Sequence, residues 1–384
     1  MKERVLLVHN FYQIGGGEHV VFEKEKRLLL ENGHEVTVYT RDNAELKGSL
    51  PKKLLLPFTA VFSLKTYREV KRIIREKGID VVHCHNTFPL ISPSVYYAAW
   101  KCGVPAVQTV HNFRFLCPNA LFFRDGRVCE DCTAKGLSCA VKHGCYRNSR
   151  LQTLVVVNML RVHRMLGTYK RLRYIFLTEF NREKFRPLLG GRTDSAFIKG
   201  NFEYIAPPKE ARNANAFVFI GRLDLNKGIA FLLKAWEAES RRELYIFGDG
   251  QYKDEVLKAQ QRQANIHYMG FQKQDVVFRY LASASALVFP SDCYEGFPMT
   301  IIEAFACGTP VVCADIGNQA DIVRETDAGI LYEGGNIESF RQALDALAKD
   351  AARLGENAEK AYLERYSPDA SYKKLKEIYE AIAK

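Results

Sequence analysis

The chain has 384 residues and a formal net charge of +11, and 47% of its residues are hydrophobic and 26% charged, without a biased tract. This composition is typical of a globular chain of two or three domains and excludes a long disordered or fibrous protein. The apolar start from Val5 to Val8 is far shorter than a signal-peptide core, and no window reaches about 18 uncharged apolar residues, so we expect neither export nor a membrane span. A cytoplasmic chain would keep its ten cysteines reduced.

Strands and helices are predicted to alternate in both halves of the chain. In the first half, strands are predicted over 4–8, 36–39, 80–83 and 106–110, and helices over 18–32, 66–77 and 94–102. After a break at 200–215 that is rich in Pro, Ala and Asn, strands are predicted over 216–220, 244–247, 266–269, 286–289 and 310–313, with helices such as 229–238 and 299–306. This alternation predicts an α/β fold of two Rossmann-like, doubly wound domains that face each other across a cleft, where ligands would bind at the carboxyl ends of the strands.

The predicted break sets the domain boundaries. We assign residues 1–200 to an N-terminal domain with a cysteine-rich insertion at 113–150, and residues 201–366 to a C-terminal domain. Residues 367–384 form an amphipathic helix in this prediction, and its apolar side needs a partner surface, for which we expect the N-terminal domain.

Positive charge is concentrated in the first half of the chain. Residues 1–200 contain 33 Lys and Arg against 17 Asp and Glu, whereas residues 201–384 contain 22 against 27. Between Asp131 and Glu179 there are nine Lys or Arg and no acid. This bias indicates an anionic partner, such as a membrane surface or another polyanion, and a merely solvated face is the alternative.

The residues that carry the most chemical information follow the predicted strand at 286–289. Pro298 near the start of a helix leaves the first-turn N–H groups of Met299 and Thr300 available to an anion, which predicts a phosphate site. Glu295 precedes this helix and Glu303 lies one turn into it, with seven residues between them. Two acids at this spacing suit the recognition of hydroxyl groups on either side of a diphosphate.

This Glu-x7-Glu stretch resembles the retaining glycosyltransferases of the GT-B fold, in particular their fourth family. The segment from Phe219 to Gly228 is similar to the strand-GR-loop-KG element of that family. Four further segments occur in the family's order, namely the glycine loop at 15–17, the histidine segment at 110–112 and the glycine turns at 247–250 and 269–271. The similarity extends over about residues 4–380.

The resemblance implies a role for each of these residues. His111 and Glu295 would be catalytic, with His111 next to the donor sugar and Glu295 on its hydroxyls, and Glu303 would bind the ribose. The donor-binding set would comprise Gly16, Gly17, Arg222, Lys227, Gly248, Gly270, Glu295, Gly296, Phe297, Pro298, Met299, Thr300 and Glu303. The N-terminal domain would then be the acceptor side, and the C-terminal domain would bind the nucleotide sugar.

The expected reaction moves a sugar from a nucleoside-diphosphate sugar with retention of the anomeric configuration. Arg222 and Lys227 are fixed cations that would stabilise the departing diphosphate, and the sequence has no Asp-x-Asp triplet, so we expect no metal and no other catalytic cofactor. The implied acceptor is a polyprenyl-diphosphate-linked or other saccharide of cell-surface polysaccharide synthesis. An anionic membrane surface would be a partner, with the enzyme peripheral on the inner face of the plasma membrane.

Five of the ten cysteines lie within 29 residues. Cys129, Cys132, Cys139 and Cys145 can supply four thiolates to a structural zinc, with Cys117 or His143 as a substitute, while disulfides and unligated thiols are the alternatives. A subset of the family that acts in bacterial surface polysaccharide synthesis carries a similar insertion, and this implies a role in shaping the acceptor site.

The segment 151–176 mixes aliphatic and basic residues and has two interpretations, a helix in the lipid headgroup layer or a core helix.

Three other functions are alternatives for the whole chain. The Glu-x7-Glu spacing with its Gly-Phe-Pro loop argues against a nucleotide-sugar epimerase, and the lack of a recognisable pyridoxal-binding lysine motif argues against a sugar phosphorylase. In a nucleic-acid-binding protein the residues predicted to bind a diphosphate would have no role, so we expect no nucleic acid partner.

Overall fold

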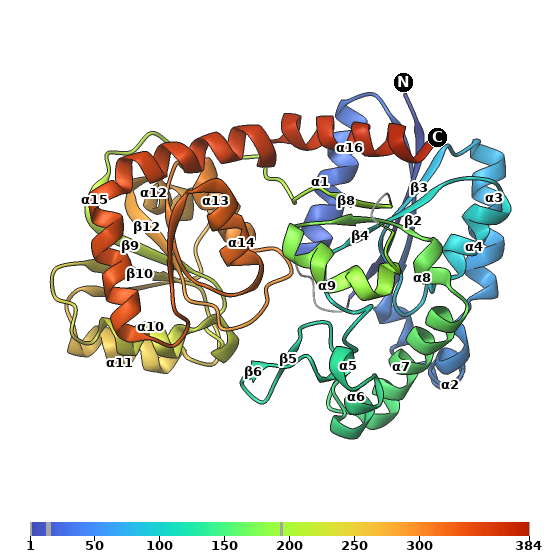
Figure 1. The fold of residues 1–384 in the computed structure, drawn as a ribbon, viewed down its shortest axis with the longest axis horizontal. Coiled ribbons are helices and arrows are strands. Elements are labelled where there is room, and N and C mark those ends of the chain that lie inside the picture. Colours follow the sequence, from blue (N-terminus) through green and yellow to red (C-terminus); the bar gives the residue numbers. More distant parts are fainter. Residues whose placement is uncertain (1, 13–16, 193–194, 384) are drawn as a thin grey trace. The chain divides into compact units, whose positions relative to one another are not determined.

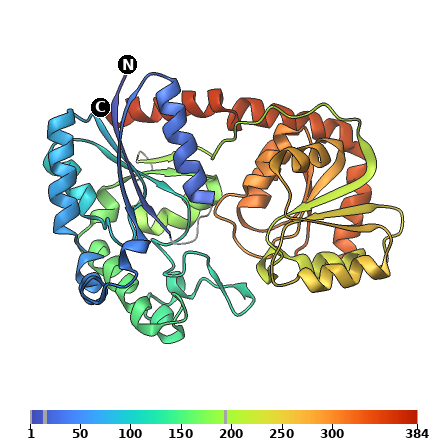
Figure 2. The same cartoon turned by 180° about the vertical axis from the view of Figure 1, so that it is seen from behind.

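The structure is a computed structural model that describes residues 2–12, 17–192 and 195–383. The chain divides into two compact units (Figures 1 and 2). Unit 1 comprises 1–121, 130–201 and 371–384, and unit 2 comprises 122–129 and 202–370. Residues 122–129 therefore group with the second unit, whereas the sequence analysis assigned them to the first.

Unit 1 is built on a six-stranded sheet in the order β2-β1-β3-β4-β7-β8, in which all pairs are parallel. The strands are β1 (Arg4–Phe11), β2 (Glu35–Asp42), β3 (Val81–Asn86), β4 (Ala106–Val110), β7 (Arg173–Phe176) and β8 (Ala196–Ile198). The longer helices of unit 1 are α1 (Gly17–Glu31), α2 (Leu50–Thr59), α3 (Leu64–Lys77), α4 (Ser94–Lys101), α7 (Arg150–Met165) and α9 (Glu179–Leu189). All six residues of β3 are buried, as expected for a central strand that is covered on both faces.

Unit 2 repeats this plan with a parallel sheet in the order β11-β10-β9-β12-β13-β14. Its strands are β9 (Asn213–Ile220), β10 (Glu243–Phe247), β11 (Ile266–Gly270), β12 (Ala284–Phe289), β13 (Val311–Ala314) and β14 (Gly329–Tyr332). Its helices are α10 (Ile229–Trp236), α11 (Lys253–Arg262), α12 (Gln274–Ser283), α13 (Met299–Ala306), α14 (Gly317–Thr326) and α15 (Ile337–Ala361). Hydrophobic side chains pack in two clusters, which contain Val218 and Phe305 in one and Phe217 and Trp236 in the other.

The C-terminal helix α16 (Pro368–Ala383) belongs with unit 1 from Ser371 onward. Leu375, Ile378, Tyr379 and Ile382 are buried in one cluster with residues of β1 and β4. The apolar side of this helix therefore covers the sheet of unit 1 although it is the last element of the chain (Figure 1).

The segment 151–176 is not a single helix, because it contains α7, the short helix α8 (Thr168–Arg171) and strand β7. Gly167, with φ of 67°, adopts the left-handed conformation where α7 gives way to α8. Val156, Val157 and Leu160 of α7 are fully buried. This face of α7 is therefore core, which agrees with the second interpretation of the segment. Within the described ranges, no helix is long and apolar enough to cross a membrane.

Candidate active site

The predicted donor residues of unit 2 surround the point where the strand order of its sheet reverses. The chain passes from β9 outward to β11 and then returns to place β12 on the other side of β9. At such a switch point the loops after the two central strands diverge and leave a ligand site at the carboxyl ends. The two loops here are 221–228 after β9 and 290–298 after β12, so the fold brings together the GR-KG element and the loop of Glu295.

Glycines allow the loops of unit 2 to pack closely at this edge. A Cβ on Gly248, whose φ is 136°, would lie 1.9 Å from the carbonyl oxygen of Gly221, and a Cβ on Gly228 would lie 1.8 Å from that of Pro290. The Gly248 N–H donates to the carbonyl of Gly270 at 2.9 Å. The three turns that follow β9, β10 and β11 are therefore in direct backbone contact, and a side chain at Gly248 would force them apart. A side chain at Gly228 would instead separate the loops after β9 and β12.

Lys227 and Glu295 form an ion pair within this site. The Lys227 Nζ lies 2.7 Å from Glu295 Oε1, and the two side chains are only 22% and 15% exposed. The hydroxyl of Ser291, which is buried, donates to the same carboxylate oxygen at 2.6 Å. Glu295 is thus held in one orientation by two partners, and the ammonium of Lys227 has further N–H donors for an anion.

The loop that carries Glu295 is fixed by helix α14. The Asn318 side chain donates to the carbonyls of Glu295 and Gly296, and the Gln319 side chain donates to those of Ser291 and Cys293 at 3.3 Å. Both amide side chains are fully buried. Helix α14 therefore holds the backbone of this loop in place.

Helix α13 starts immediately after this loop, as the sequence predicts. Pro298 precedes the helix and provides no side-chain cap. The first N–H groups of a helix have no intrahelical acceptor and lie at the positive end of its dipole, so Met299 and Thr300 can bind an anion. Glu303 lies on the second turn and is half-buried, and the Phe297 ring packs against Tyr366 with centroids 6.1 Å apart.

Arg222 has a different environment from Lys227. Its side chain is 70% exposed, and Nη1 lies 2.8 Å from Asp224 Oδ2. A surface ion pair of this kind is weak, so the guanidinium can exchange Asp224 for a phosphate at little cost.

In unit 1, His111 follows β4 and contacts a second histidine. His111 Nε2 lies 2.9 Å from His85 Nδ1, and the two rings are nearly parallel, with 18° between their planes. Burial, together with the neighbouring His85, holds the pKa of His111 well below its usual range, so the ring is neutral at pH 7. His111 also lines a cavity of about 30 Å³, which has room for about one water molecule.

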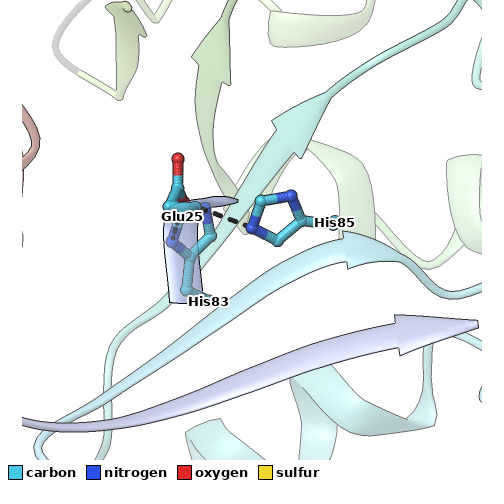
Figure 3. Close-up of side chains that lie close together, drawn as sticks. All are labelled: Glu25, His83 and His85. Carbon is cyan, nitrogen blue, oxygen red and sulfur yellow. Dashed lines mark ion pairs between the residues drawn. The ribbon is translucent and has the colours of Figure 1, made fainter. Parts of the chain in front are cut away.

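Behind His85 lies a buried carboxylate that the sequence analysis did not single out. Glu25 of α1 places Oε1 3.2 Å from both His85 Nε2 and His83 Nδ1 (Figure 3). Its other oxygen lies 2.9 Å from Lys199 Nζ. Burial alone would raise the pKa of Glu25, but Lys199 and the two imidazoles hold it well below its ordinary value, so Glu25 is ionised. The sequence does hold a sign of this cluster, because His83 and His85 alternate along the buried strand β3 with the apolar residues Val82 and Cys84.

The glycine loop of unit 1 is only partly described. Gly16 lies outside the described residues, and Gly17 is the first residue of α1. Next to it, Glu18 accepts from the Asn112 side chain at 3.2 Å, and burial raises the pKa of Glu18 to about 8. An acid in its neutral form therefore lies beside the segment of His111.

The structure brings histidines, and not the cysteines of the insertion, into a cluster among the residues that it describes. Across the parts of the chain that the structure describes, Glu25, His83 and His85 are the only group of His, Cys, Asp or Glu whose ligand atoms gather closely enough for a metal ion. Cys129 groups with unit 2, whereas Cys132, Cys139 and Cys145 group with unit 1. Cys132, Cys139 and Cys145 do not gather closely enough to share a metal ion, and the four-thiolate zinc stays a prediction.

Two Rossmann-like units, each built on a six-stranded parallel sheet, have the architecture of GT-B glycosyltransferases. Family models agree with this class. The model of "Glycosyl transferases group 1" matches residues 214–350, and that of "Glycosyltransferase Family 4" matches residues 14–127. Together they support a glycosyltransferase of this fold.

Individual proteins are similar over the whole chain or over part of it. The glycosyltransferase MJ1607 of Methanocaldococcus jannaschii is 23% identical, covering 91% of this chain and 90% of its own. The lipopolysaccharide 1,6-galactosyltransferase of Escherichia coli is 29% identical over 45% of this chain and 50% of its own. A Campylobacter jejuni N-acetylgalactosaminyltransferase, named for a diphospho-undecaprenol-linked acceptor, is 32% identical over 34% of this chain and 36% of its own. Among solved structures, Anabaena HepE in complex with UDP has a TM-score of 0.66 at 17% identity and covers 98% of this chain and 100% of its own.

Proposed function

We propose that the chain is a retaining glycosyltransferase that moves a sugar from a nucleoside-diphosphate sugar to a lipid-linked saccharide in cell-surface polysaccharide synthesis. The observation that carries this proposal is the switch point of unit 2, where Lys227, Glu295 and the first amides of α13 gather around two diverging loops. The UDP held by HepE and the acceptors in the names of the lipopolysaccharide and diphospho-undecaprenol enzymes support it.

In this proposal the diphosphate binds the amides of Met299 and Thr300 together with Lys227 and Arg222. These donors match negative charge that grows as the diphosphate leaves, so they stabilise the transition state more than the bound donor. They supply the charge that a divalent metal would otherwise supply, and we expect transfer to persist in a chelator. Glu295 binds hydroxyls of the sugar, and Glu303 binds the ribose.

The acceptor would attack from the face that the diphosphate leaves, so that the configuration at the anomeric carbon is retained. A phosphate oxygen of the leaving group can then take the acceptor's proton, and no enzymatic base is needed. His111 is assigned to the donor sugar, where a neutral imidazole can accept a hydrogen bond from a hydroxyl group.

The direct test is incubation with UDP-glucose, UDP-galactose, UDP-N-acetylglucosamine and GDP-mannose. Thermal shift and slow release of the nucleoside diphosphate would be measured for each, with and without EDTA. We expect stabilisation and turnover by at least one of them, unaffected by the chelator. Stabilisation by none of the four would contradict the proposal, and turnover that EDTA abolishes would contradict its metal-free part.

The proposed membrane location is supported by helix α2. Its exposed apolar residues Leu50, Leu54, Leu55 and Phe58, which we name the α2 surface, are 73%, 75%, 57% and 74% exposed. No residue of α2 is buried. The sequence between Glu45 and Glu69 carries five Lys or Arg and no acid. A helix with exposed aliphatic side chains and basic neighbours fits the headgroup layer of an anionic bilayer, with its apolar side inserted.

Vesicle sedimentation tests this location separately from catalysis. Wild type should bind vesicles that contain phosphatidylglycerol more tightly than vesicles of phosphatidylcholine alone, and high salt should weaken this binding. Leu54→Glu combined with Phe58→Glu should reduce binding about tenfold or more, because inserting each apolar side chain contributes about 1.5–3 kcal/mol. The matched control is Leu363→Glu, which changes a leucine of unit 2 that is 58% exposed. Equal binding by the α2 double variant and wild type would rule out the α2 surface.

A further inference from the structure

The buried network around Glu25 has no role in the function proposed above. Glu25, His83, His85 and Lys199 are 1%, 0%, 2% and 6% exposed, so all four side chains were removed from water on folding. Burying so many polar groups is unfavourable unless each is paired, and a function is a common reason for keeping them. The network reaches the site through one contact, between His85 Nδ1 and His111 Nε2 at 2.9 Å.

A metal ion is a poor occupant of this group. The Glu25 carboxylate already has a cation, because Lys199 Nζ lies 2.9 Å from Oε2. Both ring nitrogens of His83 have protein partners, since Nδ1 lies 2.8 Å from the Tyr379 hydroxyl and Nε2 lies 2.7 Å from that of Thr109. A metal would have to displace these partners and add charge next to Lys199. The group is instead a buried relay of ion pairs and hydrogen bonds, in which the Glu25 carboxylate lies between Lys199 and the two imidazoles (Figure 3).

The ionised carboxylate determines where the protons of the relay lie. Glu25 Oε1 lies 3.2 Å from His85 Nε2, and its negative charge favours the tautomer in which this nitrogen carries the proton. The opposite nitrogen of a neutral imidazole is then an acceptor, so His85 Nδ1 accepts from His111. The proton of His111 is therefore on Nε2, and its Nδ1 has the free lone pair. The ring centroids, 5.1 Å apart with 18° between the planes, agree with an in-line bond of this kind.

We infer that Glu25 and His85 are positioning residues for sugar transfer, which fix the tautomer and the orientation of His111. This inference rests on the role of His111 in the proposed function. Lys199 keeps the carboxylate ionised, and the ionised carboxylate keeps the His85 proton on Nε2. His111 then presents an unprotonated Nδ1 as an acceptor for a sugar hydroxyl, and it need not reorganise as charge develops on the sugar.

Substitutions of His85 separate positioning from packing. In His85→Asn the amide oxygen can still accept from His111 Nε2, whereas in His85→Leu the volume is filled and the acceptor is lost. We expect kcat to fall in the order wild type, Asn, Leu, with the leucine variant about 10- to 100-fold below wild type and the KM for the nucleotide sugar unchanged. The His85→Leu variant should be more thermally stable than the His85→Asn variant, because leucine suits a buried position better than asparagine.

The matched control is His83→Asn. His83 is as buried as His85 and touches the same carboxylate oxygen, but its other partners are Thr109 and Tyr379. We expect it to lose stability like His85→Asn while kcat stays within about threefold of wild type. If the leucine variant of His85 has a kcat equal to or above that of the asparagine variant, or if His83→Asn loses as much activity as His85→Leu, the positioning role is wrong.

Nitrogen-15 spectra of the histidine side chains give a readout that does not need turnover. Wild-type His111 should show a protonated Nε2 and an unprotonated Nδ1, and His85→Leu should show a mixture of tautomers. A protonated Nδ1 in the wild type would overturn the relay. If none of the four nucleotide sugars binds or is turned over while the spectra show the expected tautomer, the proposed function fails but the relay is upheld.

Discussion

Removing either partner of the Lys227–Glu295 ion pair should change diphosphate binding in opposite directions. Lys227→Met deletes a charge-assisted hydrogen bond to the diphosphate, which contributes about 1.5–3 kcal/mol when it is buried. The Lys227 side chain is 22% exposed, so screening favours the lower part of that range. We therefore expect UDP or GDP, whichever binds, to bind about 10- to 30-fold more weakly.

Glu295→Gln should have the reverse effect on the free nucleotide. The carboxylate lies 2.7 Å from the ammonium and neutralises part of its charge, so its loss leaves Lys227 more attractive to a diphosphate. The affinity for UDP or GDP should be unchanged or several-fold higher. The difference in affinity between the nucleotide sugar and the free nucleotide should become smaller.

Calorimetric titration of UDP and GDP, at about 0.15 M salt, measures both effects. Lys234→Met, on an exposed position of α10 in the same unit, is the matched control for loss of positive charge. Wild-type affinity in the Lys227 variant would refute the reasoning. Equal weakening in both variants would mean that the pair serves only to hold the loop together.

Three further predictions concern stability and metal content. Burial lowers the pKa of His83 to about 3, against an ordinary value of 6.5. As the pH falls below 6.5, His83 is protonated in the unfolded chain but not in the folded protein, so the contribution of His83 to stability is lost. Denaturant unfolding should show the difference between wild type and His83→Asn shrinking by about 1.4 kcal/mol per pH unit from pH 6.5 to 5, and a constant difference would contradict the assignment. Gly248→Ala, whose Cβ would lie 1.9 Å from the Gly221 carbonyl, should weaken nucleotide binding and destabilise unit 2, and normal binding would show that these turns can shift freely. Metal analysis of protein purified without chelator should find less than one zinc per chain, and a full equivalent would show that the cysteines of the insertion rearrange to bind it.

Most of the sheet could be predicted because buried parallel strands are apolar runs between polar turns. The predictions for 106–110 and 299–306 coincide with β4 and α13. The GR-KG loop and the Glu-x7-Glu loop were expected after the strands at 216–220 and 286–289, and they follow β9 and β12; that these two strands are neighbours is known only from the structure.

The relay was not predicted because the strands were predicted too short. Strands were expected over 4–8 and 80–83, but β1 and β3 continue to Phe11 and Asn86 through polar residues that are buried. A rule that ends a strand at the first polar residue discards His85, and only the fold brings it to Glu25 of α1 and Lys199, far away in sequence.

Helix α2 was not predicted, although its sequence carries a helical signal. Leu50, Leu54 and Phe58 recur every four residues, and a proline lies in the first turn. Pro57 argues against a helix because proline disfavours a helix interior.

The two units exchange segments along the chain, and this limits how the protein can be divided. Residues 122–129 leave the first unit to join the second, and the chain returns to the first at Ser371. A fragment that stops at residue 200 would lack Leu375 and Tyr379, which cover its sheet. It would also carry the antiparallel hairpin of β5 (Phe123–Arg124) and β6 (Arg127–Val128) without the Tyr294 ring against which Phe122 packs. Separate production of the units would therefore require a circularly permuted gene, in which the last helix is joined ahead of the first strand and residues 122–129 are replaced by a short linker.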